Sequence, residues 1–214
     1  MLSRQIIFWN VDTQADFMQP GGKLYVPGAE KLLSNLQRLT DVARVGRVFL
    51  VSDVCVHNPD DPEFQRFPPH CLRGTPGAAI VPEARATKFY VIPNRVGVKV
   101  PSDLSKVQQV ILEKQTLDVF DNPHTETVLQ RLKSFTDANA KFVVFGVVTE
   151  YCVRLAAKGL LERGRRVALV ADAIETLHPA EGRKTLDELA KMGAEMITTD
   201  RALALVDASL LHNA

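Results

Sequence analysis

Cysteine, tryptophan and long apolar runs are all scarce in this chain of 214 residues. Three cysteines make an odd, sparse set, which argues against a disulfide framework and leads us to expect a cytoplasmic protein in a reducing compartment. No apolar run reaches the ~18–20 residues that a membrane-spanning helix needs. The N-terminal segment reaches Asn10 and Asp12 too early for the apolar stretch of a signal peptide.

An excess of charge of one sign is also missing. The chain has 26 basic and 25 acidic residues, a net charge of +1, and no block of like charge. Proteins that bind nucleic acid or an anionic membrane usually carry a basic patch, so neither partner is expected here. The glycine-rich turns that hold dinucleotides and nucleoside triphosphates are absent as well, which argues against those cofactors.

Short apolar segments alternate with segments of helical periodicity. Most of these segments are apolar at both odd and even positions. Strands of a parallel sheet that helices cover on both faces have this pattern. This alternation predicts an α/β fold of three αβα layers around a doubly wound, mainly parallel, Rossmann-like sheet of about six strands. Strands are expected at 5–11, 47–52, 109–113, 142–148, 166–171 and 195–199, and helices at 29–44, 152–163 and 178–192.

The segment 55–101 interrupts this rhythm. It holds eight of the twelve prolines and has little periodicity, and loops this long are usually functional or disordered. Its aromatic residues, among them Phe64 and Phe67, favour an ordered loop. Because the chain has no internal repeat, low-complexity segment or linker, we expect a single domain over 1–214.

Three reactive side chains follow three different predicted strands. Asp12 could act as a general base or could cap a turn. Lys114 could hold a thiolate or carboxylate in its charged form, or could lie solvated at the surface. Cys152 lies in the first turn of a predicted helix, where free N–H groups lower the pKa of a thiol, although buried cysteines are often only core residues. Because ligands bind beyond the carboxyl ends of parallel strands, these three side chains could meet in one site.

The proline-rich segment and the strand before it offer a candidate metal site. Asp53, Cys55, His57 and His70 carry the ligand types that a zinc-like ion takes. Their spacing is not that of a zinc finger, and a turn-capping aspartate with two loop histidines is the alternative interpretation.

Together these features resemble the isochorismatase-like cysteine hydrolases, with the nicotinamidase branch nearest. The resemblance implies a catalytic triad of Asp12, Lys114 and Cys152, and a cis peptide bond between Val147 and Val148. It extends over nearly the whole chain and rests on V-D-T-Q-A-D-F (11–17), G-G-K-L-Y-V-P-G-A (21–29), D-P-E-F (61–64), P-P-H-C-L-R-G-T-P-G-A (68–78), Lys114 and G-V-V-T-E-Y-C-V (146–153).

Amide hydrolysis through a thioester is the mechanism that the resemblance implies. Asp12 takes the proton of Cys152 while Lys114 holds the ion pair, and the thiolate attacks an amide carbonyl. The backbone N–H groups of Val148 and Cys152 then bind the oxyanion. The expected reaction converts nicotinamide to nicotinate and ammonia, and the resemblance also implies a homodimer or homotetramer.

Two departures from the nicotinamidase pattern concern the anchoring of the substrate. Nicotinamidases that resemble this chain bind a metal, expected here to be zinc, through Asp-x-His and a later His. Asp53 and His70 match, but Cys55 stands at the middle position and His57 lies two residues later. The metal could use His57 or Cys55, or could be absent, in which case another small carboxamide or an N-carbamoyl compound becomes the expected substrate. Phe17 fits the aromatic clamp of this branch, whereas its tryptophan has no counterpart here.

Two other function classes stay open. A phosphatase of the haloacid-dehalogenase type also uses an aspartate after its first strand and a later lysine, but its two carboxylates lie two residues apart. Asp12 and Asp16 lie four apart. A non-catalytic relative would keep the fold as a binding module, and the presence of Asp12, Lys114 and Cys152 together argues against that class.

Overall fold

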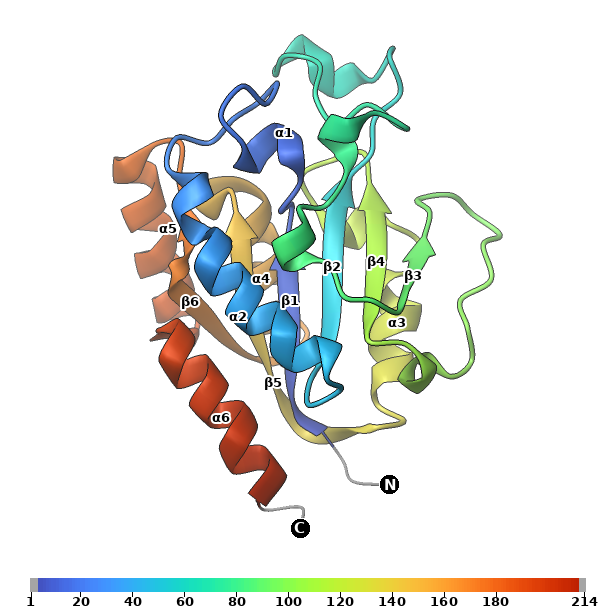
Figure 1. The fold of residues 1–214 in the computed structure, drawn as a ribbon, viewed down its shortest axis with the longest axis vertical. Coiled ribbons are helices and arrows are strands. Elements are labelled where there is room, and N and C mark those ends of the chain that lie inside the picture. The colour runs from blue at the N-terminus through green and yellow to red at the C-terminus, as the bar shows by residue number, and fades with distance from the viewer. Residues whose placement is uncertain (1–3, 212–214) are drawn as a thin grey trace.

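A computed structural model describes residues 4–211, and a seven-stranded parallel sheet forms its centre (Figure 1). The strand order is β3-β4-β2-β1-β5-β6-β7, and every neighbouring pair is parallel. The α/β fold expected from the sequence is thereby confirmed. The strands are β1 (Arg4–Val11), β2 (Phe49–Cys55), β3 (Phe89–Ile92), β4 (Gln109–Lys114), β5 (Thr136–Val147), β6 (Arg166–Glu175) and β7 (Glu195–Ile197).

Helices cover both faces of the sheet. One hydrophobic cluster joins the sheet to α1, α2 and α6, and a second cluster on the opposite face joins it to α3, α4 and α5. Figure 1 shows α2 and α6 in front of the sheet and α3 and α4 behind it. The helices are α1 (Ala15–Met18), α2 (Leu33–Arg44), α3 (Thr125–Leu132), α4 (Arg154–Glu162), α5 (Pro179–Lys191) and α6 (Thr199–Leu211).

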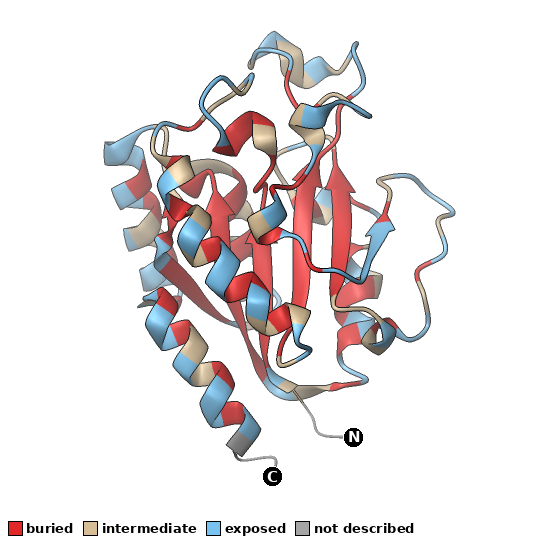
Figure 2. Cartoon of the chain, in the orientation of Figure 1, coloured by how far each residue is buried: buried red, intermediate tan, exposed pale blue. Residues whose placement is uncertain are grey.

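Strand β1 shows why the sequence pattern is apolar at both parities. Ile6 and Phe8 belong to the cluster beneath α2 and α6, whereas Ile7, Trp9 and Val11 belong to the cluster on the other face. Figure 2 shows the central strands buried along their length. A strand sandwiched between two helical layers has no face that water reaches, so no position along it favours a polar residue.

The structure contains four helices and strands that the sequence patterns did not indicate, namely β3, α1, α3 and α6. Strand β3 lies within the proline-rich segment and has only four residues, three of them exposed. It exists because its backbone pairs with β4 at the edge of the sheet, and such pairing leaves no periodic signature in so short a segment.

The predicted helix at 152–163 begins differently from the expectation. A π-helical turn, Thr149–Val153, precedes α4, so Cys152 lies in that wider turn and not in the first turn of the α-helix. The carbonyl of Val148 accepts hydrogen bonds from the N–H groups of Tyr151 and Val153, both at 3.1 Å. The bond from Val153 to Val148 joins residues five apart in the sequence, as in a π-helix, and this spacing widens the turn.

Strand β1 lies at the point where the strand order changes direction. The chain runs from β1 to β2, β3 and β4 on one side, and then crosses to β5, β6 and β7 on the other. In open α/β sheets, the crevice at such a switch point is where ligands bind. None of the helices within 4–211 combines the length and apolar character needed to cross a bilayer.

Candidate active site

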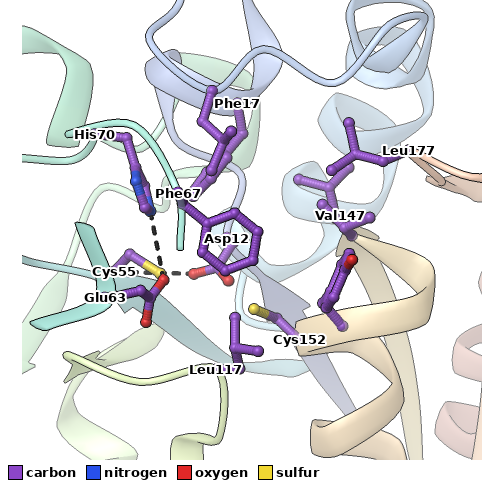
Figure 3. Close-up of a pocket in the computed structure, with 13 residues that line it drawn as sticks. Asp12, Phe17, Cys55, Glu63, Phe67, His70, Leu117, Val147, Cys152 and Leu177 are labelled. Atoms are coloured by element: carbon purple, nitrogen blue, oxygen red, sulfur yellow. Dashed lines mark hydrogen bonds and ion pairs between the residues drawn. The ribbon is translucent and has the colours of Figure 1, made fainter. Parts of the chain in front are cut away.

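A pocket opens at the carboxyl ends of the central strands (Figure 3). Asp12 follows β1, Cys55 ends β2, Lys114 ends β4, and Cys152 follows β5. The register sets these ends side by side, because Cys55 pairs with Lys114 across β2 and β4, and β1 lies between β2 and β5. Asp12, Cys55 and Cys152, which are far apart in the sequence, therefore line one pocket, and the buried Lys114 contacts all three.

Asp12, Lys114 and Cys152 lie together, as the resemblance implied. The Lys114 Nζ lies 2.7 Å from Asp12 Oδ2 and 3.5 Å from Cys152 Sγ. It also lies 3.0 Å from the sulfur of Cys55. Lys114 is completely buried, and a buried ammonium is stable only when negative or polar partners surround it. The strand ends supply those partners.

The protonation of this cluster follows from burial and from the shared lysine. Burial and, to a smaller extent, negative charge at Cys55 raise the pKa of the Asp12 carboxyl to about 7, although Lys114 opposes both. A hydrogen bond to Cys55, together with burial, holds the pKa of the Cys152 thiol well above its usual range. The same hydrogen bond holds the pKa of Cys55 well below its usual range. Asp12 is therefore poised to exchange a proton near neutral pH, as a general base should be.

The turn that carries Cys152 has the backbone geometry that the resemblance implied. The peptide bond between Val147 and Val148 is cis. Gly146, just before it, has φ +119, and a Cβ at that position would lie 2.0 Å from the carbonyl oxygen of Val11. Only glycine allows β5 to approach β1 this closely, and that approach brings Cys152 to the end of the strand that presents Asp12.

Cys55, His57 and His70 form a second cluster beside the triad. Their candidate ligand atoms lie within 4.8 Å of one another, and all three residues are buried. The Nδ1 of His57 pairs with the Asp61 carboxylate at 2.9 Å, and the Nδ1 of His70 with the Pro68 carbonyl at 2.8 Å. The Nε2 of His57 is buried and has no hydrogen-bond partner among the described residues. Imidazoles held through one nitrogen with the other facing a buried group are typical of metal ligands.

Asp53 does not belong to this cluster. Its Oδ2 accepts a hydrogen bond of 2.7 Å from the indole N–H of Trp9, and its Oδ1 lies 4.0 Å from Lys114 Nζ. Burial raises the pKa of the Asp53 carboxyl well above its usual range. Asp53 therefore lies near Lys114. The sulfur of Cys55, and not the carboxylate of Asp53, lies close to the two histidines.

Glu63 is a site residue that the sequence reasoning missed. Its Oε1 lies 3.9 Å from the Nε2 of His57 and 3.8 Å from the Nε2 of His70, and it lines the pocket. Glu63 lies in a short 3-10 turn that Asp61 caps by accepting the Glu63 N–H at 2.9 Å. The dipeptide Asp61-Pro62 was the sequence signal for this turn, because an aspartate followed by proline often begins a helical turn. Glu63 then falls within the turn.

Aromatic and aliphatic side chains form the remaining walls. Phe17, expected in a substrate clamp, lines the pocket with its ring centroid 5.3 Å from that of His70. Phe67 and Tyr151 face each other edge to face at 5.9 Å and line the pocket too. Trp9 lies within β1 and is buried in the core, not in the pocket. The pocket thus combines apolar walls with a few convergent polar groups, as small-molecule sites do.

Comparisons with known proteins point to one family. A sequence model of the isochorismatase domain matches residues 90–201. The isochorismatase domain-containing protein 2 of Danio rerio is 33% identical over 79 residues, which are 37% of this chain and 40% of that protein. The match therefore spans well under half the length of that curated relative.

Solved structures share the fold over almost their whole length. A pyrazinamidase of Pyrococcus horikoshii in complex with zinc superposes with a TM-score of 0.71 at 24% identity, covering 91% of this chain and 99% of that one. N-carbamoylsarcosine amidase from Thermoplasma acidophilum gives 0.69 at 22%, covering 92% and 97%. A nicotinamidase from Bacillus subtilis gives 0.71 at 19%, covering 90% and 99%. At these identities the likeness establishes the fold.

Proposed function

Because this chain belongs to the isochorismatase domain family of hydrolases, we propose that it is a cysteine amidohydrolase that cleaves a C–N bond of a small amide. The observation that carries the proposal is the placement of Lys114 Nζ at 2.7 Å from Asp12 and 3.5 Å from the sulfur of Cys152. A carboxylate, a buried cation and a thiol in one pocket are the groups that nucleophilic acyl transfer requires.

The reaction proceeds in two stages. Asp12 takes the proton of Cys152 while Lys114 balances the negative charge, and the sulfur attacks the amide carbonyl. The N–H groups of Val148 and Cys152 stabilise the oxyanion that forms. Asp12 then gives its proton to the departing ammonia, and water hydrolyses the thioester to release the acid. Each step uses groups that meet at the ends of β1, β4 and β5.

Nicotinamide is the substrate that we propose first. The flat aromatic walls formed by Phe17, Phe67 and Tyr151 suit a planar ring, and two neighbours in structure carry the names nicotinamidase and pyrazinamidase. The alternative is another carboxamide or an N-carbamoyl compound, which the Cys55 substitution and the carbamoylsarcosine amidase neighbour support. Family membership argues against the haloacid-dehalogenase type of phosphatase.

A metal ion fits Cys55, His57 and His70, with Glu63 facing both imidazoles. One sulfur and two imidazole nitrogens form a donor set that suits zinc. The Nε2 of His57 is buried and makes no hydrogen bond within the described part of the chain, and this observation favours an ion here. When bound, zinc supplies a coordination site for a donor atom of the substrate, such as a ring nitrogen.

Ammonia release from a panel of amides tests the proposal. The panel contains nicotinamide, other carboxamides and N-carbamoyl compounds, each with and without a strong chelator. We expect nicotinamide turnover that the chelator abolishes. Turnover of a different amide that is indifferent to the chelator would keep the chemistry and shift the substrate to the alternative. Silence across the whole panel would favour a non-catalytic member of the family.

A further inference from the structure

Two of the three cysteines are neighbours in the pocket. The Nζ of Lys114 lies 3.0 Å from the sulfur of Cys55 and 3.5 Å from that of Cys152. Both residues line the pocket that a small solute would enter (Figure 3). Cys71 is buried elsewhere, with its sulfur 4.0 Å from the carbonyl of Gly77.

The backbones of both cysteines are well anchored. The N–H of Cys55 donates to Asp12 Oδ1 at 3.1 Å and to Gln14 Oε1 at 2.8 Å, and Cys152 is held within the π-helical turn after β5. A disulfide requires the two sulfurs to approach to ~2.0 Å. Because the chain is fixed on both sides, side-chain rotation must supply that approach, and both sulfurs already lie within 3.5 Å of the same Lys114 nitrogen.

We propose that Cys55 and Cys152 form a peroxide-reactive pair, in which oxidation joins the nucleophile to its neighbour in a reversible disulfide. This inference rests on the proposed amidase function only because it takes Cys152 as the nucleophile. The covalent bond itself can be detected without any turnover. Cys55 therefore acts as a resolving thiol in addition to facing the two histidines.

The chemistry needs one equivalent of a hydroperoxide. Asp12 takes the thiol proton of Cys152, the more exposed residue of the pair at 6% against 1%, and the resulting thiolate attacks the peroxide, so that an S–O bond forms and the O–O bond breaks. The sulfur is oxidised by two electrons to sulfenic acid, and hydrogen peroxide is reduced to water. The Cys55 sulfur then attacks the Cys152 sulfur. The S–S bond forms, the S–O bond breaks, and the hydroxyl leaves as water with the thiol proton.

Two consequences follow for the enzyme. The disulfide blocks the nucleophile while it lasts, and it protects Cys152 from the irreversible sulfinic and sulfonic states. It also removes the sulfur of Cys55 from the cluster with His57 and His70. Oxidation is thus expected to release a metal held there, and a bound metal is expected to slow the oxidation.

Peptide mass spectrometry after peroxide treatment tests the pair. The full-length protein, as purified and again after chelation, is treated with hydrogen peroxide and its free thiols are alkylated. We expect a peptide linked through Cys55 and Cys152, and loss of amidase activity that dithiothreitol restores. Cys71→Ala is the matched control and should form the same link. In Cys55→Ser, Cys152 should instead be trapped by dimedone as sulfenic acid, and its further oxidation should resist dithiothreitol.

Absence of the Cys55–Cys152 link both as purified and after chelation would overturn the proposal, as would a link through Cys71. If Cys55→Ser fails to fold, Cys152→Ala serves in its place, and its Cys55 must then stay free of any disulfide. A protein that forms the link but hydrolyses no amide would contradict the proposed function alone. An active amidase without the link would contradict this inference alone.

Discussion

Lys114 is the residue on which the active-site cluster depends most. Its buried ammonium touches the carboxylate of Asp12 and two sulfurs, and lies 4.0 Å from Asp53. Burial lowers the pKa of Lys114. The negative charges of Asp12 and Cys152 outweigh burial and hold this pKa well above its usual range. Lys114 is therefore the positive charge that lets two carboxyls and two thiols share one buried site.

Replacing Lys114 by methionine should destabilise the protein strongly. The change leaves buried carboxyls without their cation, and breaking a buried ion pair costs about 3–5 kcal/mol. Urea denaturation measures this loss, with Lys106→Met as the control, because the Lys106 side chain is 80% exposed. Equal stability of the two variants would mean that Lys114 does not stabilise the cluster.

Replacing Asp12 by asparagine should abolish turnover and still give a folded protein, although loss of the ion pair with Lys114 lowers its stability. Asp12 has φ 47, a conformation that asparagine tolerates at least as well as aspartate, so the backbone accepts the change. The amide accepts no proton from Cys152, and we expect kcat to fall by roughly 10³–10⁴-fold. Circular dichroism and ammonia release measure the two effects, with the exposed Asp60→Asn as the control. An active Asp12→Asn enzyme would place the base elsewhere.

At the scale of single elements, the sequence predicts helices that have a periodic apolar pattern. It does not predict local geometry that depends on one hydrogen-bond partner. The helix expected at 178–192 is α5, Pro179–Lys191, because Pro179 and Gly193 bound a periodic segment. The π-helical turn around Cys152 depends instead on one carbonyl, that of Val148, which accepts two N–H groups. No residue type in the turn encodes that geometry, so the sequence indicated an ordinary helix start.

Gly146 offers a test of how tightly β5 must lie against β1. A methyl group there would collide with the Val11 carbonyl oxygen at 2.0 Å, and either β5 or Asp12 would have to move. We expect Gly146→Ala to lose about 2–4 kcal/mol of stability and most of its amidase activity. Gly46→Ala is the matched control, since Gly46 also has positive φ, +76, but has open space around it. Similar losses in both variants would mean that backbone strain alone, and not the β1–β5 contact, is responsible.

At the scale of the whole molecule, strand order decides which of the predicted site residues lie together in the structure. Asp12, Lys114 and Cys152 follow central strands, and parallel strand ends necessarily gather at one edge. Strand order could not predict which residues lie near His70. His57 meets His70 because a backbone pairing between His57 and the chain at Cys71 and Arg73 folds the loop back on itself. That pairing lies outside the regular strands and has no periodic signal.

Metal analysis should separate Cys55 from Asp53 as the ligand. We expect the protein to bind zinc, and expect Cys55→Ser and His57→Ala to lose affinity by about 10-fold or more, because each removes a donor. Asp53→Asn should keep its zinc, since Asp53 pairs with Trp9. Cobalt substitution adds a second readout, in the form of a sulfur-to-cobalt charge-transfer band that Cys55→Ser lacks. Zinc lost on changing Asp53 and kept on changing Cys55 would reverse this assignment.

The edge strand β3 motivates a prediction about assembly. Phe89, Tyr90 and Val91 are 41%, 37% and 38% exposed at one edge of the sheet, and exposed apolar edges usually pair or are covered. We predict a homodimer or homotetramer, as the family resemblance also implies. Light scattering after size exclusion measures the mass, and a shift toward monomer in Tyr90→Lys would place β3 in the interface. A monomeric native protein would contradict this prediction.

The most direct test of the central claim is ammonia release by the native enzyme and by Cys152→Ala on the same best substrate. The claim predicts that the variant folds normally and loses kcat by about 10⁴-fold or more, because the sulfur that forms the thioester is gone. Cys71→Ala, which changes a buried cysteine outside the pocket, should keep its turnover. Substantial turnover by Cys152→Ala would contradict the account, because the C–N bond would then be broken without the thiol.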